Sequence, residues 1–409
     1  MSLRSVEEQL EVVLAEAAPL PTMRVPLEAA AGATLAEAVR ARVAIPVFDN
    51  SAMDGFAVRF EDVRAASPET PITLRVVADL PAGSPDDPPL AAGEAARIMT
   101  GAAVPTAADA IVPFEDTAGG LEDSLRSAVV TRAPRARGAH IRRRGEDLLP
   151  DDIVLEPGVA LGGLALSAAA AAGVTEVVVH RRPRVIVVST GAELAAPGAE
   201  LRRGQIPESN SVLLASLARE AGAEVISVAT VDDEPHSLRA VLDGAADADV
   251  VLTSGGVSAG AYEVVKNVLG GQIAFTKVAM QPGKPQAFGR LSSGALVFGL
   301  PGNPVSAAVS FEVFVRPALL RMQGRTEIAR PRLRLPAARA WPTPPGRRQY
   351  LPAAVDRSDP SRWTVRPATA GGSGSHLAGG LGRAEALAVV PADVESVAVG
   401  DPVDVLLLT

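Results

Sequence analysis

SGGVSAG (254–260), QPGKP (281–285) and PGNPVSA (301–307) are three loops rich in Gly, Pro and Ser, and they alternate with short apolar runs such as LVFGL (296–300). In an open parallel sheet, loops of this kind gather at one edge, where the carboxyl ends of strands meet the amino ends of helices. Their backbone N–H groups suit anionic oxygens. The stretch therefore predicts a phosphate or oxyanion site on an α/β core.

Around this stretch, apolar β runs alternate with helix-like segments over residues 181–328. This alternation is typical of a parallel sheet with helices on both faces, so we predict a three-layer α/β domain. We expect strands at 185–189, 224–231, 250–253, 273–278 and 295–300, and helices at 211–221, 235–245, 262–269 and 305–321.

The two flanking regions have a different pattern. Residues 1–180 form an N-terminal region that starts with a capped helix near residues 5–17 and carries an inserted β-rich subdomain at about 57–140. In residues 329–409, Pro and Gly recur among short β runs, which predicts a small C-terminal β-barrel. The expected architecture is therefore a multidomain α/β plus β chain.

The composition narrows the classes of function. The chain has 409 residues, a net charge of −8, no cysteine and four histidines that are far apart in the sequence. Without cysteine, disulfides, thiolate-held zinc and cysteine nucleophiles are excluded, and any metal is expected to be a hard cation held by carboxylates and substrate oxygens. The acidic balance argues against nucleic-acid binding. No signal peptide or membrane span is expected, so we predict a soluble cytoplasmic protein.

Polar groups near two strand ends are candidates for contacts with an oxyanion and a cation. In VVSTGAEL (187–194), Ser189 and Thr190 can donate to an oxyanion and Glu193 can hold a cation, although a plain turn with a solvated Glu fits the same residues. Asp233 in VDDEP precedes a helix, where an acid is favourable without a further role. As a magnesium ligand it would need a facing phosphate.

A helix start and a glycine loop supply further candidates. Asn210, next to Ser209, fits either a helix N-cap or an anion-binding helix terminus. Gly255 and Gly256 let the backbone turn tightly and approach a ligand, and Ser258 can donate a hydrogen bond there. No Walker pattern follows these glycines. A purely structural turn is the alternative.

Two lysines flank the second loop. Lys277 on the preceding strand and Lys284 in QPGKP would together suit a pyrophosphate or a tetrahedral oxyanion, although each alone is more often a surface lysine. Asn303 lies between two prolines ahead of a helix, where Pro304 fits the first helical position. This third loop is either part of the site or a signal that ends a strand and starts a helix.

The N-terminal region contains two irregular segments that look like site loops, with Asp54 in MDG and Thr100 in MTGA. The arginines of RARGAHIRRRGED (135–147) form a charge run, which is typical of a solvated face. Because the protein is acidic overall, an anionic partner for this run is an equally open alternative.

Nine segments, in order, resemble the molybdopterin molybdenumtransferase family, the bacterial MoeA type related to the E domain of gephyrin. They are SAMDGFAV (51–58), RIMTGA (97–102), RRRGED (142–147), VVSTGAEL (187–194), SNS (209–211), SGGVSAG (254–260), PGKP (282–285), LPGNPVSA (300–307) and SGSHLAGGL (373–381). The resemblance implies the same division into an N-terminal region with an inserted β subdomain, an α/β molybdopterin-binding domain and a C-terminal β-barrel. It also implies an elongated homodimer, with the cleft between the α/β domain of one subunit and the inserted subdomain of the other.

The resemblance further implies a magnesium-dependent reaction in which adenylylated molybdopterin and molybdate give molybdenum cofactor and AMP. Molybdenum then ends on sulfurs of the substrate itself, so the protein needs no cysteine. Breaking the pyrophosphate bond needs charge neutralised by Mg²⁺, lysine and backbone N–H groups. The molybdopterin adenylyltransferase would be a further partner, and the choice between molybdenum and tungsten stays open.

Matching motifs transfer the roles of the family's residues to this chain. The catalytic residues would be Asp54, Thr100, Glu193, Asp233, Glu263, Lys277 and Lys284, with Glu193 and Asp233 as metal ligands. The substrate-binding residues would be Arg142, Asp147, Ser189, Thr190, Asn210, Gly255, Gly256, Ser258, Pro301, Asn303, Pro304 and Ser375. The chain departs from the family pattern at Glu263, where Asp is common, at Gln281, where Lys is frequent, and at Phe56, where Tyr is frequent.

Two other functions stay open. A molybdopterin adenylyltransferase uses the same type of α/β domain, but the long N-terminal region and the β tail favour metal insertion. A non-catalytic scaffold of the gephyrin type has no use for Asp, Glu and Lys side chains clustered at glycine loops.

Overall fold

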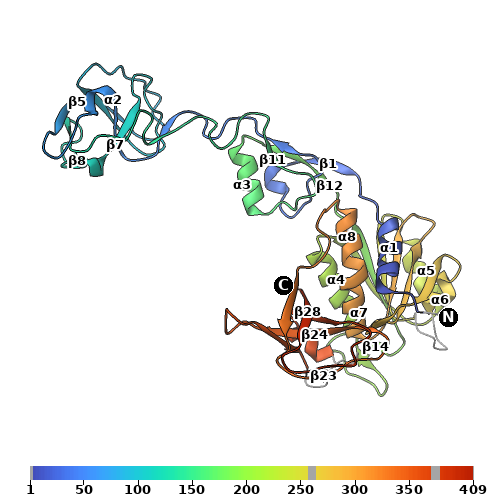
Figure 1. Cartoon of the computed structure of the whole chain (residues 1–409). Helices are drawn as coiled ribbons and strands as arrows, with labels where there is room; N and C mark the ends of the chain where they lie inside the picture. The colour runs from blue at the N-terminus through green and yellow to red at the C-terminus, as the bar shows by residue number, and fades with distance from the viewer. Residues whose placement is uncertain (1–2, 257–263, 370–377, 409) are drawn as a thin grey trace.

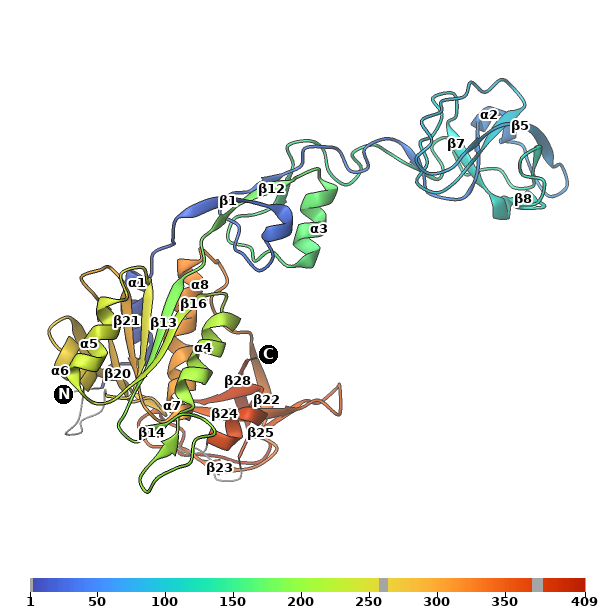
Figure 2. The ribbon, with the colours of Figure 1, turned by 180° about the vertical axis from the view of Figure 1, so that it is seen from behind.

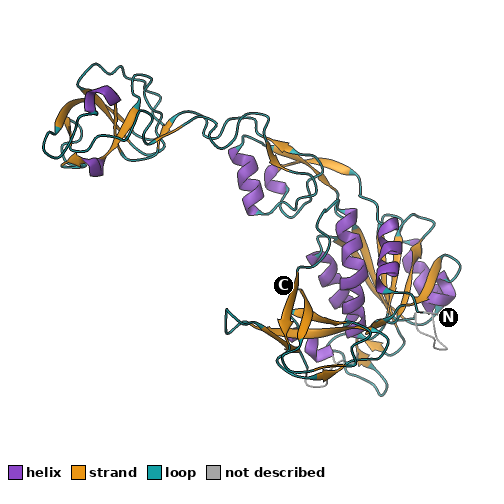
Figure 3. Ribbon diagram, in the orientation of Figure 1, coloured by secondary structure: helices purple, strands orange, loops and turns teal. Residues whose placement is uncertain are grey.

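The computed structural model describes residues 3–256, 264–369 and 378–408. The chain is elongated, with an inserted β subdomain at one end, the α/β and C-terminal β domains together at the other, and a small middle subdomain between them (Figures 1 and 2). Helices gather around the α/β domain, whereas strands and loops dominate the insert and the C-terminal domain (Figure 3). None of the helices in the described ranges combines the length and the apolar composition needed to cross a bilayer.

The α/β domain is built on a six-stranded sheet with the order β16-β13-β17-β21-β20-β18. The first four strands are parallel, whereas β20 is antiparallel to both of its neighbours. β17 and β21 are buried at every position, as expected for strands covered on both faces. The strands are β13 (Arg184–Thr190), β16 (Glu224–Val231), β17 (Val250–Ser254), β18 (Ile273–Lys277), β20 (Pro285–Arg290) and β21 (Leu296–Leu300).

Helices cover both faces of this sheet and form two apolar cores. Val187 and Val188 are adjacent on β13 but belong to different cores, because successive side chains of a strand point to opposite faces. This confirms the predicted three-layer α/β domain. The first core includes side chains from α1 (Val6–Glu16), α4 (Asn210–Glu220), α7 (Pro304–Ser310) and α8 (Arg316–Met322), and the second includes side chains from α5 (Pro235–Asp243) and α6 (Val264–Leu269).

The first helix, α1, packs on the α/β domain, although it lies within the stretch 1–180 that the sequence groups as an N-terminal region. Its buried Val6 and Val13 share a core with Leu319 of α8, and the two helices are in contact. An amphipathic helix packs wherever its apolar stripe finds a partner, and the pattern of the stripe does not identify that partner.

The last helix of the α/β domain is continuous but not uniform. The sequence predicts one helix over residues 305–321, and the structure has α7, then a π-helical turn η3 (Phe311–Val315), then α8. Pro317 lies at the start of α8. A proline in a helix lacks a backbone donor and its ring crowds the carbonyl of the preceding turn. The wider π turn just before Pro317 accommodates that ring.

The middle subdomain joins both ends of the insert to the rest of the chain. Its two strand pairs, β1 with β12 and β2 with β11, are antiparallel. The chain leaves it near Ile45 and returns near Leu148, and these two residues form a bridge. Its elements are β1 (Thr22–Pro26), η1 (Leu27–Ala29), β2 (Val39–Arg40), β11 (Ile153–Leu155), α3 (Gly163–Ala171) and β12 (Glu176–His180).

The insert contains a six-stranded sheet with the order β7-β4-β6-β5-β9-β8 and a separate pair, β3 with β10. The insert thus spans the chain between Ile45 and Leu148, a wider range than the predicted 57–140. Its elements are β3 (Asn50–Ser51), β4 (Gly55–Val58), α2 (Phe60–Val63), β5 (Ile72–Leu80), β6 (Glu94–Ile98), β7 (Ala110–Pro113), η2 (Phe114–Asp116), β8 (Thr117–Ala118), β9 (Ser127–Val130) and β10 (Ile141–Arg142).

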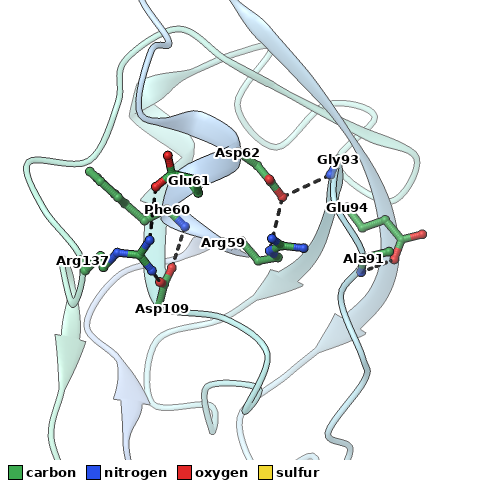
Figure 4. Close-up of polar contacts among 9 residues, drawn as sticks. All are labelled: Arg59, Phe60, Glu61, Asp62, Ala91, Gly93, Glu94, Asp109 and Arg137. Carbon is green, nitrogen blue, oxygen red and sulfur yellow. Dashed lines mark hydrogen bonds and ion pairs between the residues drawn. The ribbon is translucent and has the colours of Figure 1, made fainter.

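Ion pairs within the insert use part of the arginine run. Figure 4 shows Asp109 accepting hydrogen bonds from the Phe60 N–H, at 2.5 Å, and from the guanidinium of Arg137, which fixes the start of α2. Arg143 in turn pairs with Asp49 at 2.6 Å. Arg137 and Arg143 therefore hold loops of the insert together.

The C-terminal domain is a partly closed β sheet. Four strands pair in the order β24-β26-β28-β22, and β25 pairs with the other side of β24. A bridge from Ala337, just after β22, to Val365 of β25 joins the two edges, so that the predicted barrel is closed in part. The elements are β22 (Arg332–Pro336), β23 (Trp341–Pro342), β24 (Arg348–Asp356), β25 (Thr364–Pro367), η4 (Ala378–Arg383), β26 (Ala386–Val390), β27 (Ser396–Val397) and β28 (Pro402–Leu407).

Candidate anion-binding cleft at the edge of the α/β sheet

A cleft of about 920 Å³ lies where β13, β17 and β21 end and where α4 and α7 begin. The C-terminal domain contributes Ala378 to its wall, and the short strands β14 (Leu194–Ala195) and β15 (Ile206–Pro207) contribute one side. Among the residues predicted from the sequence, those lining the cleft are Ser189, Thr190, Glu193, Asn210, Asp233, Gly255, Gly256, Lys284, Pro301, Asn303 and Pro304.

The floor of the cleft is made by loops whose backbones touch. Gly255 has a φ of +94°, and a Cβ atom at that position would lie 2.5 Å from the carbonyl oxygen of Thr190. A Cβ at Gly302 would lie 3.5 Å from the Cα of Gly255. The Gly255 N–H donates to the Leu300 carbonyl at 3.1 Å, so this donor fastens β17 to β21 and does not face a ligand. Glycine is required at position 255 to let the strand ends converge.

Asn210 is a buried connector between the loops. Its Nδ2 donates to the hydroxyl of Ser254 at 2.7 Å and to the carbonyl of Gly302 at 2.6 Å. Its Oδ1 is buried and has no hydrogen-bond partner among the residues that the structure describes. A buried acceptor without a partner is costly, so this oxygen is a natural contact for a donor brought by a ligand or a water.

Glu208 was not predicted from the sequence, yet it organises the same edge of the sheet. It is buried, and its carboxylate accepts hydrogen bonds from the Ser189 hydroxyl at 2.8 Å, from the Ser211 N–H at 2.8 Å and from the Ser211 hydroxyl. The residue at the N-cap of α4 is Ser209, next to the candidate Asn210, and its side chain makes no capping bond. Glu208 thus occupies the amino terminus of α4, where an acidic side chain is electrostatically favourable.

Two carboxylates stand at the rim of the cleft. Glu193 is exposed in the turn after β13, and Asp233 is half-buried in the loop after β16. The Ala192 N–H donates to Asp233 at 3.2 Å, which ties the two loops together. In residues 3–256, 264–369 and 378–408, no group of three or more His, Cys, Asp or Glu side chains is arranged to hold a metal. A cation at this rim would therefore take at most two carboxylates from the described residues.

The two predicted lysines have different surroundings. Lys284 lines the cleft, whereas Lys277 is exposed at the end of β18 and is not among the lining residues. The two are nevertheless close, because Lys277 is in register with Pro285 on the neighbouring strand. Gln281, which stands where the family often has Lys, also lines the cleft and accepts a hydrogen bond from Arg347 at 2.7 Å. The C-terminal domain thus brings a guanidinium to the side chain of Gln281.

In the insert, the structure brings Asp54 and Thr100 together. The Asp54 carboxylate accepts hydrogen bonds from the Thr100 N–H at 2.6 Å and from its hydroxyl at 2.8 Å. These bonds lower the pKa of Asp54 below its usual value, so the carboxylate stays charged to lower pH. Arg142 is exposed on β10, and the Asp147 N–H donates to Ile45 at the neck of the insert.

Within one chain, the insert does not meet the cleft. The insert with β7 lies at the opposite end of the molecule from α7 and β14, which flank the cleft (Figures 1 and 2). Asp54, Thr100, Arg142 and Asp147 are therefore remote from Glu193 and Lys284 in the same chain. Phe56 is buried in the core of the insert against Phe114, with ring centroids 5.2 Å apart. Ser258, Glu263 and Ser375 lie outside the described residues.

Comparisons with known proteins agree with this geometry. Three family models match the chain in succession: the MoeA N-terminal region (domain I and II) over residues 4–173, the "probable molybdopterin binding domain" over 186–321, and the MoeA C-terminal region (domain IV) over 334–408. The chain is 45% identical to Molybdopterin molybdenumtransferase 2 of Mycobacterium tuberculosis, over the full length of both proteins. It is 37% identical to the Haemophilus influenzae molybdopterin molybdenumtransferase over 79% of each.

A solved structure supports the same assignment. The molybdopterin biosynthesis protein moeA from Pyrococcus horikoshii OT3 superposes with a TM-score of 0.84 at 28% identity, and the match covers 99% of this chain and 100% of that one. The order of domains, the cleft at the strand ends and the full-length relatives lead to one conclusion: the chain belongs to the molybdopterin molybdenumtransferase family.

Proposed function

We propose that the protein inserts molybdate into adenylylated molybdopterin, giving molybdenum cofactor and AMP. The observation that carries this proposal is the cleft, where Lys284, two rim carboxylates and buried hydrogen-bonding side chains meet at touching strand ends. Both substrates are anionic, and their binding needs fixed positive charge and donors. The activity is the one named for the relatives that match the whole chain.

We propose that Glu193 and Asp233 hold a magnesium ion together with phosphate oxygens of the substrate. Two carboxylates fit this ion, because Mg²⁺ is commonly bound by one or two carboxylates and completes its shell with water and substrate phosphates. When bound, the ion would neutralise charge on the pyrophosphate. Lys284 would contact the same anionic oxygens, and Asn210 would orient the ligand through its buried Oδ1, which has no partner in the described part of the chain.

We propose further that a second copy of the chain completes the cleft. The Asp54–Thr100 pair can join the cleft only if it comes from another subunit, since its own insert lies at the far end of the molecule (Figure 2). The chain also carries an uncovered apolar helix face on α3, where the Leu164 side chain is 92% exposed. Uncovered apolar surface of this kind is typical of a subunit contact. We expect the homodimer to act in the cytoplasm.

The direct test is an assay of purified protein with adenylylated molybdopterin and molybdate, in which release of AMP is measured with and without Mg²⁺. Glu193→Ala is expected to lose the activity while it still dimerises. Glu200→Ala is the matched control, because Glu200 is an exposed acid in the loop that follows β14. Adenylylation of molybdopterin by ATP would overturn the proposal, and so would full activity of the Glu193→Ala protein.

The metal site needs a measurement that does not depend on turnover. Binding of inorganic pyrophosphate, followed by calorimetry, is expected to strengthen when Mg²⁺ is added to the wild-type protein. The strengthening should vanish in Glu193→Ala and Asp233→Ala and persist in Glu200→Ala. Equal binding with and without Mg²⁺ would contradict the assignment of the two carboxylates.

A further inference from the structure

The segment before α1 forms an additional edge beside the loop that carries Lys284. The Arg4 N–H donates to the Lys277 carbonyl at 2.9 Å, and the Ala279 N–H donates to the Arg4 carbonyl at 2.8 Å. These two bonds make a parallel bridge between Arg4 and Val278. Residues separated by more than 270 positions in the sequence thus lie side by side next to the anion-binding loop.

The same short stretch is also paired by the C-terminal domain. Met280 and Gln281 form β19 (Met280–Gln281), which pairs in parallel with the start of β24. The Arg348 N–H donates to the Ala279 carbonyl at 3.0 Å. Val278 and Met280 are fully buried. The chain between Lys277 and Gln281 is therefore held by the segment before α1 and by β24 of the C-terminal domain.

A further backbone hydrogen bond connects the restrained stretch 277–281 to Lys284. The Val278 N–H donates to the Lys284 carbonyl at 2.8 Å, which closes the PGK loop back on the restrained stretch. Arg4, Val278 and Lys284 thus form one continuous series of backbone hydrogen bonds. A shift of the Arg4 edge would loosen the backbone on which both Lys277 and Lys284 are mounted.

The Arg4 edge is itself anchored at two points. Ser5 and Glu8 form a capping box at the start of α1, and the Arg4 guanidinium donates to Gln9, which is buried, at 2.9 Å. In the first turn of the helix, Glu7 forms an ion pair with Arg348 of β24. α1 therefore connects the C-terminal domain to the edge at Arg4 and leaves this edge little freedom.

We infer that Arg4 is a positioning residue of the anion site, acting through its backbone: it fixes the position of the Lys284 ammonium group for a ligand with pyrophosphate or molybdate oxygens. The inference rests on the proposed function, since it takes Lys284 as an anion-binding group. Affinity for a small anion depends on charges that are held in place before the ligand arrives. The segment before α1 supplies that order without touching the ligand.

The test compares Arg4→Pro with Arg4→Ala. Proline removes the N–H that donates to Lys277, whereas alanine keeps both backbone bonds and removes only the side chain. Binding of inorganic pyrophosphate to the full chain is measured by calorimetry, and amide hydrogen exchange is measured in residues 277–284. A lost backbone hydrogen bond should weaken binding about three- to tenfold in Arg4→Pro. Exchange of the Val278 amide should rise, while Arg4→Ala stays within about twofold of the wild type.

The outcomes separate the inference from the proposed function. If the wild type does not bind pyrophosphate, or if Lys284→Ala binds it as well as the wild type does, the proposed anion site is wrong. If the wild type binds and Arg4→Pro matches Arg4→Ala in affinity, the positioning role is wrong. A loss of binding that only follows a fall in melting temperature would also count against it.

A second variant covers the case in which Arg4→Pro does not fold. Glu7→Gln removes the ion pair with Arg348 and leaves the backbone of the segment intact. Glu7→Gln should weaken pyrophosphate binding, as Arg4→Pro does, but by a smaller factor. Glu11→Gln on the same helix is the matched control, because Glu11 is exposed and takes part in no ion pair among the described residues. Equal binding by the two variants would overturn the inference.

Discussion

Gly255 is the residue on which the convergence of the strand ends depends. Its φ of +94° is strained for any side chain, and a Cβ would overlap the Thr190 carbonyl. Gly255→Ala should therefore destabilise the protein by about 1–3 kcal/mol and weaken pyrophosphate binding, because the loops must move apart. Urea denaturation gives the first quantity and calorimetry the second.

Gly198→Ala is the control for this substitution. Gly198 also has a positive φ, +84°, but a Cβ there would meet nothing within 4 Å. The control shows the backbone term alone, so the difference between the two variants measures the clash with Thr190. Equal stabilities for the two variants would mean that the loops at Gly255 move apart at little cost, so that the predicted clash with Thr190 adds nothing.

The Asp54–Thr100 pair makes a prediction about pH. Thr100→Val removes one of the two donors that hold the pKa of Asp54 down, so that pKa should rise towards the ordinary value of about 3.9. Because the folded pKa is depressed, the bond stabilises the fold above the unfolded pKa and ceases to do so as the pH falls through the folded pKa. Carboxyl NMR titration measures the shift.

A similar pair in the same subdomain provides the control. Thr106 donates its N–H and its hydroxyl to Asp87, both at 2.8 Å, and the pKa of Asp87 is also lowered by these bonds. Thr106→Val should raise the pKa of Asp87 and leave Asp54 unchanged. A Thr100→Val protein whose Asp54 titrates as in the wild type would contradict the assigned cause.

At the level of elements, the helix with the π turn carries a buried ion pair to the C-terminal domain. Glu312 accepts two hydrogen bonds from Arg330, at 2.9 and 3.0 Å, and Arg330 also donates to the Leu408 carbonyl. Burial and the neighbouring Arg330 lower the pKa of Arg316 to about 10. Arg316 and Arg330 thus share Glu312 as the carboxylate that balances their charge, and all three side chains are largely buried.

Glu312→Ala should destabilise the protein by about 3 kcal/mol, at the low end for a broken buried pair, since Arg330 keeps some contact with solvent. Chemical denaturation of the purified variant measures the loss. Arg334→Ala, which breaks an exposed pair with Asp404, should cost less than about 1 kcal/mol. Similar losses of unfolding free energy in the two variants would show that the buried pair stabilises the fold no more than the exposed pair does.

The elements that could be predicted are those with a strong local signal. The largely apolar runs at 250–253 and 295–300 predicted two central strands, since parallel strands covered on both faces are rich in apolar residues. Glu208 could not be recognised, because its partners Ser189 and Ser211 come together only when the strand and the helix pack. The backbone hydrogen bond between Arg4 and Lys277 could not be predicted either, since no local sequence pattern specifies pairing between residues so far apart in the chain.

At the scale of the whole molecule, the position of the insert raises the question of how its residues could share a site with the cleft of the α/β domain. Only a family resemblance assigned Asp54 and Glu193 to one catalytic site. The folded chain keeps the insert, which carries Asp54, and the α/β domain, whose cleft Glu193 lines, at opposite ends (Figure 1). The insert is joined to the rest of the molecule by two chain segments, near Ile45 and Leu148. Few contacts cross such a connection, so no local sequence pattern specifies where the insert lies. A site shared between two subunits reconciles the candidate residues with this shape.

Such sharing can be tested by mixing two inactive chains. Asp54→Ala keeps the cleft intact and Glu193→Ala keeps the insert intact, so a heterodimer of the two has one composite site with no substitution and one with both. Purified through two different tags, it should show about half of the wild-type AMP release, as expected for a two-fold dimer with independent sites. A heterodimer of Asp54→Ala with Thr100→Ala should stay inactive, because each insert is then defective. If the first heterodimer is as inactive as its parents, the two residues act within one chain, and the shared site is excluded.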